Sequence, residues 1–172
     1  CQDTELMHIQ LYMNRGNLYQ ELKELDHSLK NLNYAEKLFN TQNNFYKKDY
    51  LDVQIVTNKA NTLSRMGRNK EALKLFDSLF KRNPLMDKHK KPNELQAKVY
   101  INYGGVLNEL NQKKDAVTYL FRAESFYRSY SHPKSQYFHD ECTLNLSIAY
   151  KIFGSKGFVA IQKWSLSSSL RM

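Results

Sequence analysis

The side chains best suited to metal chemistry lie close together late in the chain. His139 and Cys142 are three positions apart in a helical pattern, with His132 and Asp140 nearby. Imidazole, thiolate and carboxylate groups all bind Zn²⁺, but structural zinc sites usually draw four ligands from tighter paired spacings. We therefore expect a partly buried thiol and surface histidines here. No metal and no cofactor is predicted.

The remaining reactive side chains do not form a pattern typical of an enzyme. Ser, His and Asp are present, but none has the glycine-flanked turn of a hydrolase nucleophile. Gly104 and Gly105 lie inside a helical pattern, which favours close helix packing over a phosphate-binding loop. Glu21 and Glu24 form a pair of carboxylates on an exposed helix surface. We expect a protein that is not an enzyme.

One amide side chain recurs at a nearly constant interval. Asparagine occupies positions 14, 58, 102 and 145, which are 44, 44 and 43 residues apart. An asparagine amide can donate to a carbonyl and accept from an N–H, which are the groups that an extended peptide backbone presents. A row of such amides could therefore hold a peptide. The same asparagines could instead serve contacts between neighbouring helices, and both interpretations stay open.

Amphipathic helical patterns carry these positions. Apolar residues recur at three- and four-residue steps after position 69, at Ala72, Leu73, Leu75, Phe76, Leu79 and Phe80. Gly67 suits the left-handed residue that ends the preceding helix, and Pro84 prevents the following helix from continuing. The chain contains only 6 Gly and 3 Pro, which are too few turn-forming residues for a many-stranded sheet. The sequence predicts an all-α protein.

The patterns predict eight helices in four hairpins. The expected helices cover residues 5–22, 26–40, 48–66, 69–81, 94–110, 113–130, 135–153 and 157–170. A loop is expected over 83–92, and a further break at 131–133. The hairpins therefore span about 5–40, 48–82, 94–130 and 135–170, in a single domain over 1–172 that we expect to be part of a longer protein.

The hairpins repeat with a period of about 44 residues. The first helix carries a small residue at Gly16, Ala60, Gly104 and Ser147, and a large one three positions later at Tyr19, Leu63, Leu107 and Tyr150. The second helix opens with a small residue at Ser28, Ala72, Ala116 and Ala160, and continues with a large one at Leu32, Phe76, Leu120 and Trp164. Small residues fall where two helices must approach closely.

This pattern resembles the tetratricopeptide repeat family over nearly the whole chain. It differs from the family in its period, which is about ten residues longer than the usual 34. The aromatic residue near the start of the first helix is clear only at Tyr12 and Tyr100. Longer repeats of this kind are similar to those of kinesin light chains and bacterial peptide-sensing regulators. The resemblance implies a right-handed superhelix of about four helical hairpins, whose first helices line a concave groove.

The resemblance also implies a scaffold that binds a protein or peptide partner in that groove. The candidate groove residues are Asn14, Asn17, Asn58, Asn61, Arg65, Lys98, Asn102 and Asn145. They would form an asparagine row with two basic residues beside it. A clamp for the terminal carboxylate of a peptide would need a tighter group of Lys, Arg and Asn than Arg65 and Lys98 provide.

The sequence is also compatible with two other function classes. One is a sensor or regulatory module of a larger bacterial signalling protein or transcriptional regulator. The other, and weaker, is a nucleic-acid-binding helical repeat, which the net charge of +9 and pI near 9.4 would suit. The basic residues are scattered, however, and the densest run, at 88–91, flanks a proline in a loop. We therefore expect no nucleic-acid partner.

The ends of the chain bear on its assembly and its compartment. No polar capping helix follows the last hairpin, which would expose Phe158 and Trp164. We therefore expect a truncated fragment, a homodimer formed through this hairpin, or another partner that covers it. No apolar run is long enough to cross a bilayer. Residue 1 is Cys, which indicates either an artificial boundary or the lipidated start of a processed bacterial lipoprotein. The first alternative suits a cytoplasmic protein and the second an extracytoplasmic one.

Overall fold

The computed structural model describes residues 2–41, 48–87, 92–129 and 135–150, and every regular element in these ranges is helical. The predicted all-α class is confirmed. The chain divides into two compact units, Cys1–Lys91 (unit 1) and Pro92–Met172 (unit 2). The single domain over 1–172 stays a prediction. The expected helix over 157–170, with Phe158, Ala160 and Trp164, lies outside the described residues.

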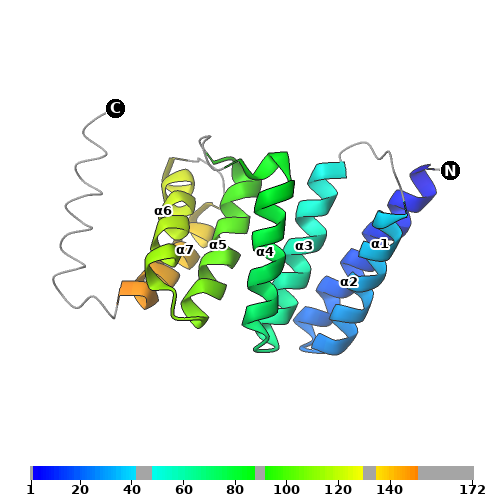
Figure 1. The fold of residues 1–172 in the computed structure, drawn as a ribbon, viewed down its shortest axis with the longest axis horizontal. Helices are drawn as coiled ribbons and strands as arrows, with labels where there is room; N and C mark the ends of the chain where they lie inside the picture. Colours follow the sequence, from blue (N-terminus) through cyan, green and yellow to red (C-terminus); the bar gives the residue numbers. More distant parts are fainter. Residues whose placement is uncertain (1, 42–47, 88–91, 130–134, 151–172) are drawn as a thin grey trace. The chain divides into compact units, whose positions relative to one another are not determined.

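Unit 1 contains two helical hairpins and a short 3₁₀ helix (Figure 1). Its elements are α1 (Gln2–Glu21), α2 (Leu25–Asn40), α3 (Lys48–Arg65), α4 (Asn69–Arg82) and the 3₁₀ helix Pro84–Met86. α1 pairs with α2 and α3 pairs with α4, while α3 also packs on both helices of the first hairpin. Residues of α1, α2 and α3 share one apolar cluster, made of Ile9, Met13, Ala35, Phe39, Leu51 and Ile55.

The described residues of unit 2 repeat this arrangement with one hairpin and the helix that follows it. Its elements are α5 (Glu94–Glu109), α6 (Lys113–Ser129) and α7 (Ser135–Tyr150). α7 packs on both α5 and α6, as α3 packs on α1 and α2. Asn93 caps the start of α5: its side chain accepts from the Gln96 N–H at 2.9 Å, and the Gln96 side chain accepts from the Asn93 N–H at 3.0 Å.

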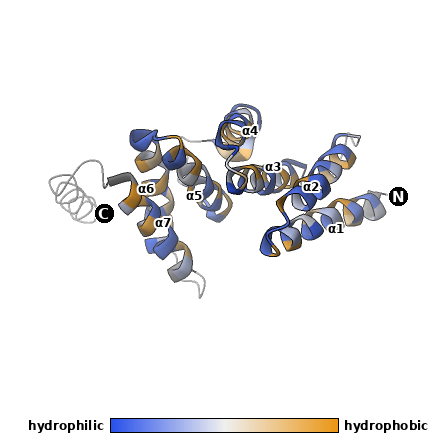
Figure 2. Cartoon of the chain, turned by 90° about the horizontal axis from the view of Figure 1, so that it is seen from below, coloured by the Kyte–Doolittle hydropathy of each residue, from blue (hydrophilic) through white to orange (hydrophobic). Residues whose placement is uncertain are grey.

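The second helix of each hairpin buries the same repeat positions. The buried residues of α2, α4 and α6 align at 44-residue steps as Ser28, Ala72 and Ala116, then Leu32, Phe76 and Leu120, then Ala35, Leu79 and Ala123. Steps of four and three residues place them on one helix face. Figure 2 shows that apolar residues lie mainly where helices of one unit face each other, and polar residues mainly on the outer faces.

Glycine in the first helix permits the close approach that the repeat predicted. A Cβ atom added to Gly16 in α1 would lie 2.7 Å from Cγ of Leu32 in α2. A Cβ on Gly104 in α5 would overlap Leu120 of α6 in the same way. The absence of a side chain at the glycine in one helix thus leaves the space that the leucine side chain of the other helix fills.

The turn inside each hairpin also recurs every 44 residues. Lys23, Gly67 and Asn111 have positive φ angles of 62°, 77° and 59°. In each turn the next residue's N–H reaches back five positions to a helix carbonyl, as Arg68 does to Leu63 at 2.8 Å. This is the left-handed C-cap predicted at Gly67. At position 23 a lysine adopts it, at a conformational cost that glycine avoids.

The predicted helix ends that fall within the described residues are correct to within three residues. The largest of these differences is at the start of α1, which begins at Gln2, three residues before the expected Glu5. The predicted end at residue 153 and the helix over 157–170 lie outside the described residues. The predicted loop after α4 contains the 3₁₀ helix, because the Asn83 side chain accepts from the Leu85 N–H at 3.0 Å and starts a new turn.

Candidate functional site

All eight predicted groove residues lie on the first helices of the hairpins. In unit 1 they come from α1 and α3, and in unit 2 from α5 and α7, two neighbouring helices in each unit. Asn14, Asn17 and Arg65 are exposed, and Asn58, Asn61, Lys98, Asn102 and Asn145 are partly exposed. None of the eight is buried, so each is accessible to a ligand within its unit.

In unit 1 a buried glutamine sets the distance between α1 and α3. Gln20, only 5% exposed, donates from Nε2 to the carbonyl oxygen of Asn58 at 3.0 Å and also bonds to Thr62 Oγ1. Its Oε1 accepts from Asn61 Nδ2 at 3.4 Å. Asn61 is therefore attached to the helix interface, while the Asn58 side chain is not needed for this bridge.

Unit 2 contains the equivalent bridge between α5 and α7. Asn108, 5% exposed, donates from Nδ2 to the carbonyl oxygen of Asn145 at 2.9 Å. Asn108 lies two repeat periods after Gln20. Asn145 and Asn58 both belong to the row asparagines, which are the asparagines at the recurring position, Asn14, Asn58, Asn102 and Asn145. A buried amide thus holds the helix that carries the row asparagine in both units. The sequence alone gave no sign of this role.

Two of the row asparagines in unit 2 have oriented amides. Asn102 donates from Nδ2 to the Lys98 carbonyl, and Asn145 to the Glu141 carbonyl, both at 3.1 Å and both four residues back in the same helix. With Nδ2 directed along the helix, Oδ1 and the second N–H are left for other partners. Oδ1 of Asn145 faces Gly105, where an added Cβ would lie 3.9 Å from it.

The two basic candidates differ in their surroundings. Arg65 is exposed in the last turn of α3. Lys98 forms an ion pair with Glu94 at 2.6 Å, and its Nζ lies 5.3 Å from the ring centroid of Phe138. The carboxylate of Glu94 offsets the charge of Lys98, which reduces its value for binding an anionic chain terminus.

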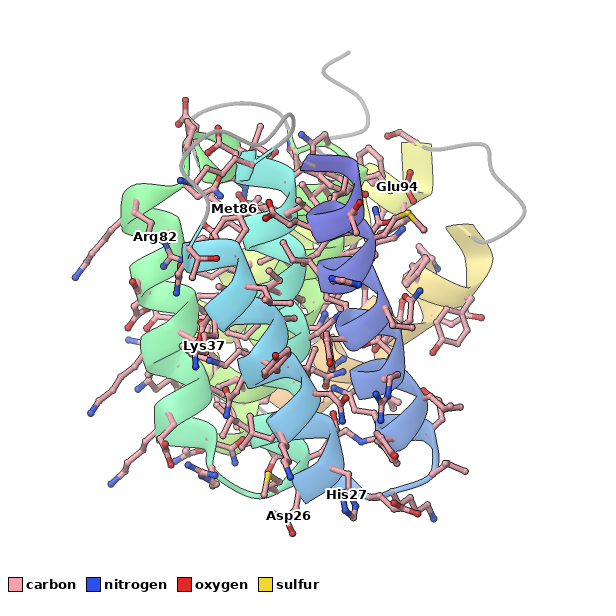
Figure 3. All side chains as sticks on the ribbon, turned by 90° about the vertical axis from the view of Figure 1, so that its right-hand side faces the viewer. Asp26, His27, Lys37, Arg82, Met86 and Glu94 are labelled. Carbon is pink, nitrogen blue, oxygen red and sulfur yellow. The ribbon has the colours of Figure 1, made fainter. Side chains whose placement is uncertain are left out.

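A cleft of about 530 Å³ in unit 1 contains none of these residues and is lined by side chains of α2, α3 and α4 and by Asn83. It is lined by Glu36, Phe39, Asn40, Lys48, Asp49, Asp52, Ile55, Val56, Leu75, Ser78, Arg82 and Asn83. Figure 3 shows Arg82 near the end of α4, at the opposite end of unit 1 from Asp26 and His27. Sequence patterns did not indicate this cleft, because it depends on residues about 30 positions apart.

Three of the charged side chains that line the cleft, those of Glu36, Asp52 and Arg82, already form ion pairs. Asp52 accepts from Arg82 at 2.5 Å and from Asn83 Nδ2 at 3.0 Å. Glu36 accepts from Lys59, whose side chain is only 11% exposed, at 2.6 Å. A ligand would have to replace these contacts. The cleft is therefore a weaker candidate site than the first-helix surface.

The region considered for zinc has a different structure from a metal site. Cys142 is fully buried rather than partly, and burial raises the pKa of its thiol to about 12, with the carboxylates of Glu141 and Glu124 adding to the effect. His139 Nε2 lies 3.3 Å from the buried carboxylate of Glu124 across the α6–α7 interface. Among the described residues, which exclude His132, no group of three or more His, Cys, Asp or Glu could hold a metal ion.

No helix among the described residues is long and apolar enough to cross a membrane.

No protein-family model matches the sequence, and no curated protein matches it. Among solved structures the chain is similar to the crystal structure of a TPR-like protein from Chlorobium tepidum TLS. The similarity covers 85% of this chain and 96% of that one, with 15% sequence identity and a TM-score of 0.64. The predicted tetratricopeptide-like helical repeat is therefore confirmed as the fold; the long-period variety stays a prediction.

Proposed function

We propose that the chain is a non-catalytic scaffold that binds a protein or an extended peptide through the exposed surface of the first helices. The contacts would come from the side-chain amides of Asn14, Asn58, Asn102 and Asn145, with Asn17, Asn61, Arg65 and Lys98 selecting side chains. The main support is that an accessible asparagine occupies one repeat position in α1, α3, α5 and α7.

The surroundings of these asparagines support the proposal. The buried amides of Gln20 and Asn108 hold the helices through backbone carbonyls, so the packing of the helices does not consume the row side chains. Asn102 and Asn145 have oriented amides before any ligand arrives. A preoriented amide loses less conformational freedom on binding than a mobile one, which favours affinity for a peptide backbone.

The proposal is tested with peptides selected by the full chain from a displayed library of random sequences. The affinity of a selected peptide is then measured by calorimetry for the wild type and for Asn58→Ala with Asn102→Ala. We expect affinity to fall by about tenfold or more, since two amide partners are lost at about 1 kcal/mol each. Thermal unfolding of the variant should stay close to that of the wild type.

The control variant is Asn33→Ala with Ser125→Ala, which changes exposed polar residues of the second helices α2 and α6. It should bind the selected peptides as the wild type does. Peptides that bind equally well to the asparagine variant would exclude the row as the binding surface. Loss of binding on substitution of Arg82 or Asp52 would direct attention to the cleft instead.

Two alternatives have less support among the described residues. Several basic side chains of the described residues form ion pairs with carboxylates, among them Lys59, Arg68, Arg82, Lys98 and Arg128. Such pairing disfavours a nucleic-acid surface, and affinity for RNA that does not fall with salt would exclude phosphate binding. A regulatory module of a larger protein would use the same peptide-binding surface, with a downstream domain as the output.

A further inference from the structure

The buried bridge of unit 2 contains one acceptor without a donor. Asn108 donates from Nδ2 to the carbonyl oxygen of Asn145 at 2.9 Å, but its Oδ1 is buried and accepts no hydrogen bond from the described residues. Lys113 Nζ donates to the backbone carbonyl of Asn108 at 3.0 Å and so does not satisfy the side-chain oxygen. A buried acceptor without a donor costs free energy, and native structures contain few of them.

In unit 1 the corresponding bridge has this donor. Gln20, two repeat periods before Asn108, accepts at Oε1 from Asn61 Nδ2 at 3.4 Å. The residue that corresponds to Asn61 in α7 is Ile148, 87 positions later, and its side chain has no N–H or O–H. The bridge of unit 2 therefore lacks the donor that α3 supplies in unit 1.

A second side chain is missing next to the same bridge. Gly105 lies one turn before Asn108 on α5, and a Cβ added to it would meet only Asn145 Oδ1, at 3.9 Å, within 4 Å among the described residues. Unit 1 has Asn17 at this repeat position. We call this open space, bordered by Gly105, Asn108, Asn145 and Ile148, the Gly105 hollow.

The surface that carries the Gly105 hollow stays open when both hairpins of a pair are described. In unit 1 the second helices α2 and α4 are both present, and Asn58 and Asn61 remain partly exposed. Their counterparts in unit 2 are Asn145, which is partly exposed, and Ile148, which is 39% exposed. A second helix packed on its hairpin partner thus leaves this surface accessible to a ligand.

The Gly105 hollow presents acceptors and lies near negative charge. Asn145 directs Nδ2 to the backbone carbonyl of Glu141 at 3.1 Å and Oδ1 toward Gly105. Glu109, one turn after Gly105 on α5, is exposed. The carboxylate of Glu141, one turn before Asn145 on α7, is half-buried and forms no ion pair within the described part of the chain. Such surroundings favour a group that carries several donors and a positive charge.

We propose that the Gly105 hollow binds a lysine side chain of the peptide held by the row asparagines, an inference that rests on the proposed function. An ammonium group has three donors and no acceptor. It donates to Oδ1 of Asn145 and gives Oδ1 of Asn108 the hydrogen bond that Asn61 gives Gln20 in unit 1. The methylene stem of the lysine packs on Ile148.

The first test uses a defined probe, Nα-acetyl-lysine N-methylamide, and needs no selected peptide. In an NMR titration of the full chain at millimolar probe concentrations, the side-chain amide signals of Asn108 and Asn145 should shift. The norleucine analogue has the same stem without the ammonium, and should leave both signals in place. Signals that do not respond to the lysine probe, or that respond equally to both probes, would overturn the proposal.

The second test restores the donor of unit 1. Ile148→Asn should satisfy Asn108 Oδ1 from within the protein and lower the affinity for the lysine probe by about tenfold or more, with unit 2 at least as stable as before. The matched control is Leu144→Asn, at a leucine of the same helix that is 61% exposed, which should bind the probe as the wild type does. Undiminished binding by Ile148→Asn would contradict the assigned role of Asn108.

Peptides selected by the full chain separate this inference from the proposed function. Replacing the seated lysine with norleucine should lower affinity by about tenfold or more. If Asn58→Ala with Asn102→Ala weakens binding but no lysine of the peptide matters, the lysine site is wrong and the asparagine row stands. If the lysine probe binds at the Gly105 hollow while the asparagine variant keeps full peptide affinity, the row is wrong and the lysine site stands.

Discussion

Gln20 of α1 donates a hydrogen bond from Nε2 to the backbone carbonyl oxygen of Asn58 in α3, at 3.0 Å. The bond connects neighbouring first helices through the backbone of a row residue. Asn108 makes the same connection to Asn145 in unit 2, at 2.9 Å. This division of tasks, with buried amides fixing the helices and accessible amides left for a ligand, underlies the proposed function.

Replacing Gln20 should destabilise unit 1. Gln20→Ala removes the bonds to Asn58 and Thr62 and leaves buried polar groups without that partner, at a cost of roughly 1–3 kcal/mol. Chemical denaturation followed by circular dichroism measures the loss. Gln10→Ala, at an exposed glutamine of the same helix, should change stability by less than about 0.5 kcal/mol. Equal effects of the two changes would show that the bridge contributes nothing.

The left-handed turns should respond to glycine in opposite ways. Lys23→Gly relieves a positive φ of 62° and should stabilise the fold by roughly 0.5–1 kcal/mol. Gly67→Ala, at a φ of 77°, should destabilise it by about 1 kcal/mol. Denaturant midpoints give both values. A Lys23→Gly variant less stable than the wild type would mean that the lysine side chain makes a contact that stabilises the fold by more than the positive φ destabilises it.

Two adjacent glycines in α5 should behave differently when changed to alanine. Gly104→Ala introduces a Cβ that overlaps Leu120, and should destabilise unit 2 by roughly 1–2 kcal/mol. Gly105→Ala meets only Asn145 Oδ1 at 3.9 Å, and should stabilise α5 by about 1 kcal/mol through helix propensity. In a Leu120→Ala background the penalty at position 104 should largely disappear. If it persists, the Gly104–Leu120 contact is not its cause.

Much of the fold could be predicted because its signals are local or periodic. The steps of Ala72, Phe76 and Leu79 predict a helix face. The 44-residue interval predicts that Gly104 lies where two helices approach closely, and in the structure the side chain of Leu120 fills that place. The turn at Lys23 has no local signal, since lysine rarely adopts a positive φ; only its distance of one period from Gly67 could have indicated it.

The candidate site was predicted less completely. The row asparagines could be found because they repeat at one phase. The Gln20–Asn58 bridge joins positions 38 residues apart, so it appears only when two helices are packed together. The ion pair of Asp52 with Arg82 joins α3 and α4, and the cleft beside it is lined by residues of three helices, α2, α3 and α4. Periodicity describes which face of a helix is apolar, and it does not describe which polar groups meet across an interface.

The stability of unit 2 should depend on pH through Glu141. Burial raises the pKa of this carboxyl above its ordinary value. The stability that the neutral form contributes is fully present below the unfolded pKa of about 4.3 and is lost as pH rises through the raised folded pKa. Glu141→Gln should therefore raise Tm at pH 7 and leave it unchanged at the lowest pH at which the protein folds.

The control for that change is Glu109→Gln, at an exposed carboxyl of α5. Thermal melts followed by circular dichroism across the pH range measure both variants. A Glu141→Gln effect that is the same at low and neutral pH would mean that the glutamine acts by packing and not by removing the charge of a half-buried carboxylate.

The most direct test of the proposed binding surface is an NMR titration of the full chain with a library-selected peptide, observing the side-chain amide signals of asparagine. We expect the signals of Asn58, Asn102 and Asn145 to shift together as the peptide concentration rises, while the signal of Asn33 stays in place. Shifts confined to Asn40 and Asn83, which line the cleft between α2 and α4, would contradict it.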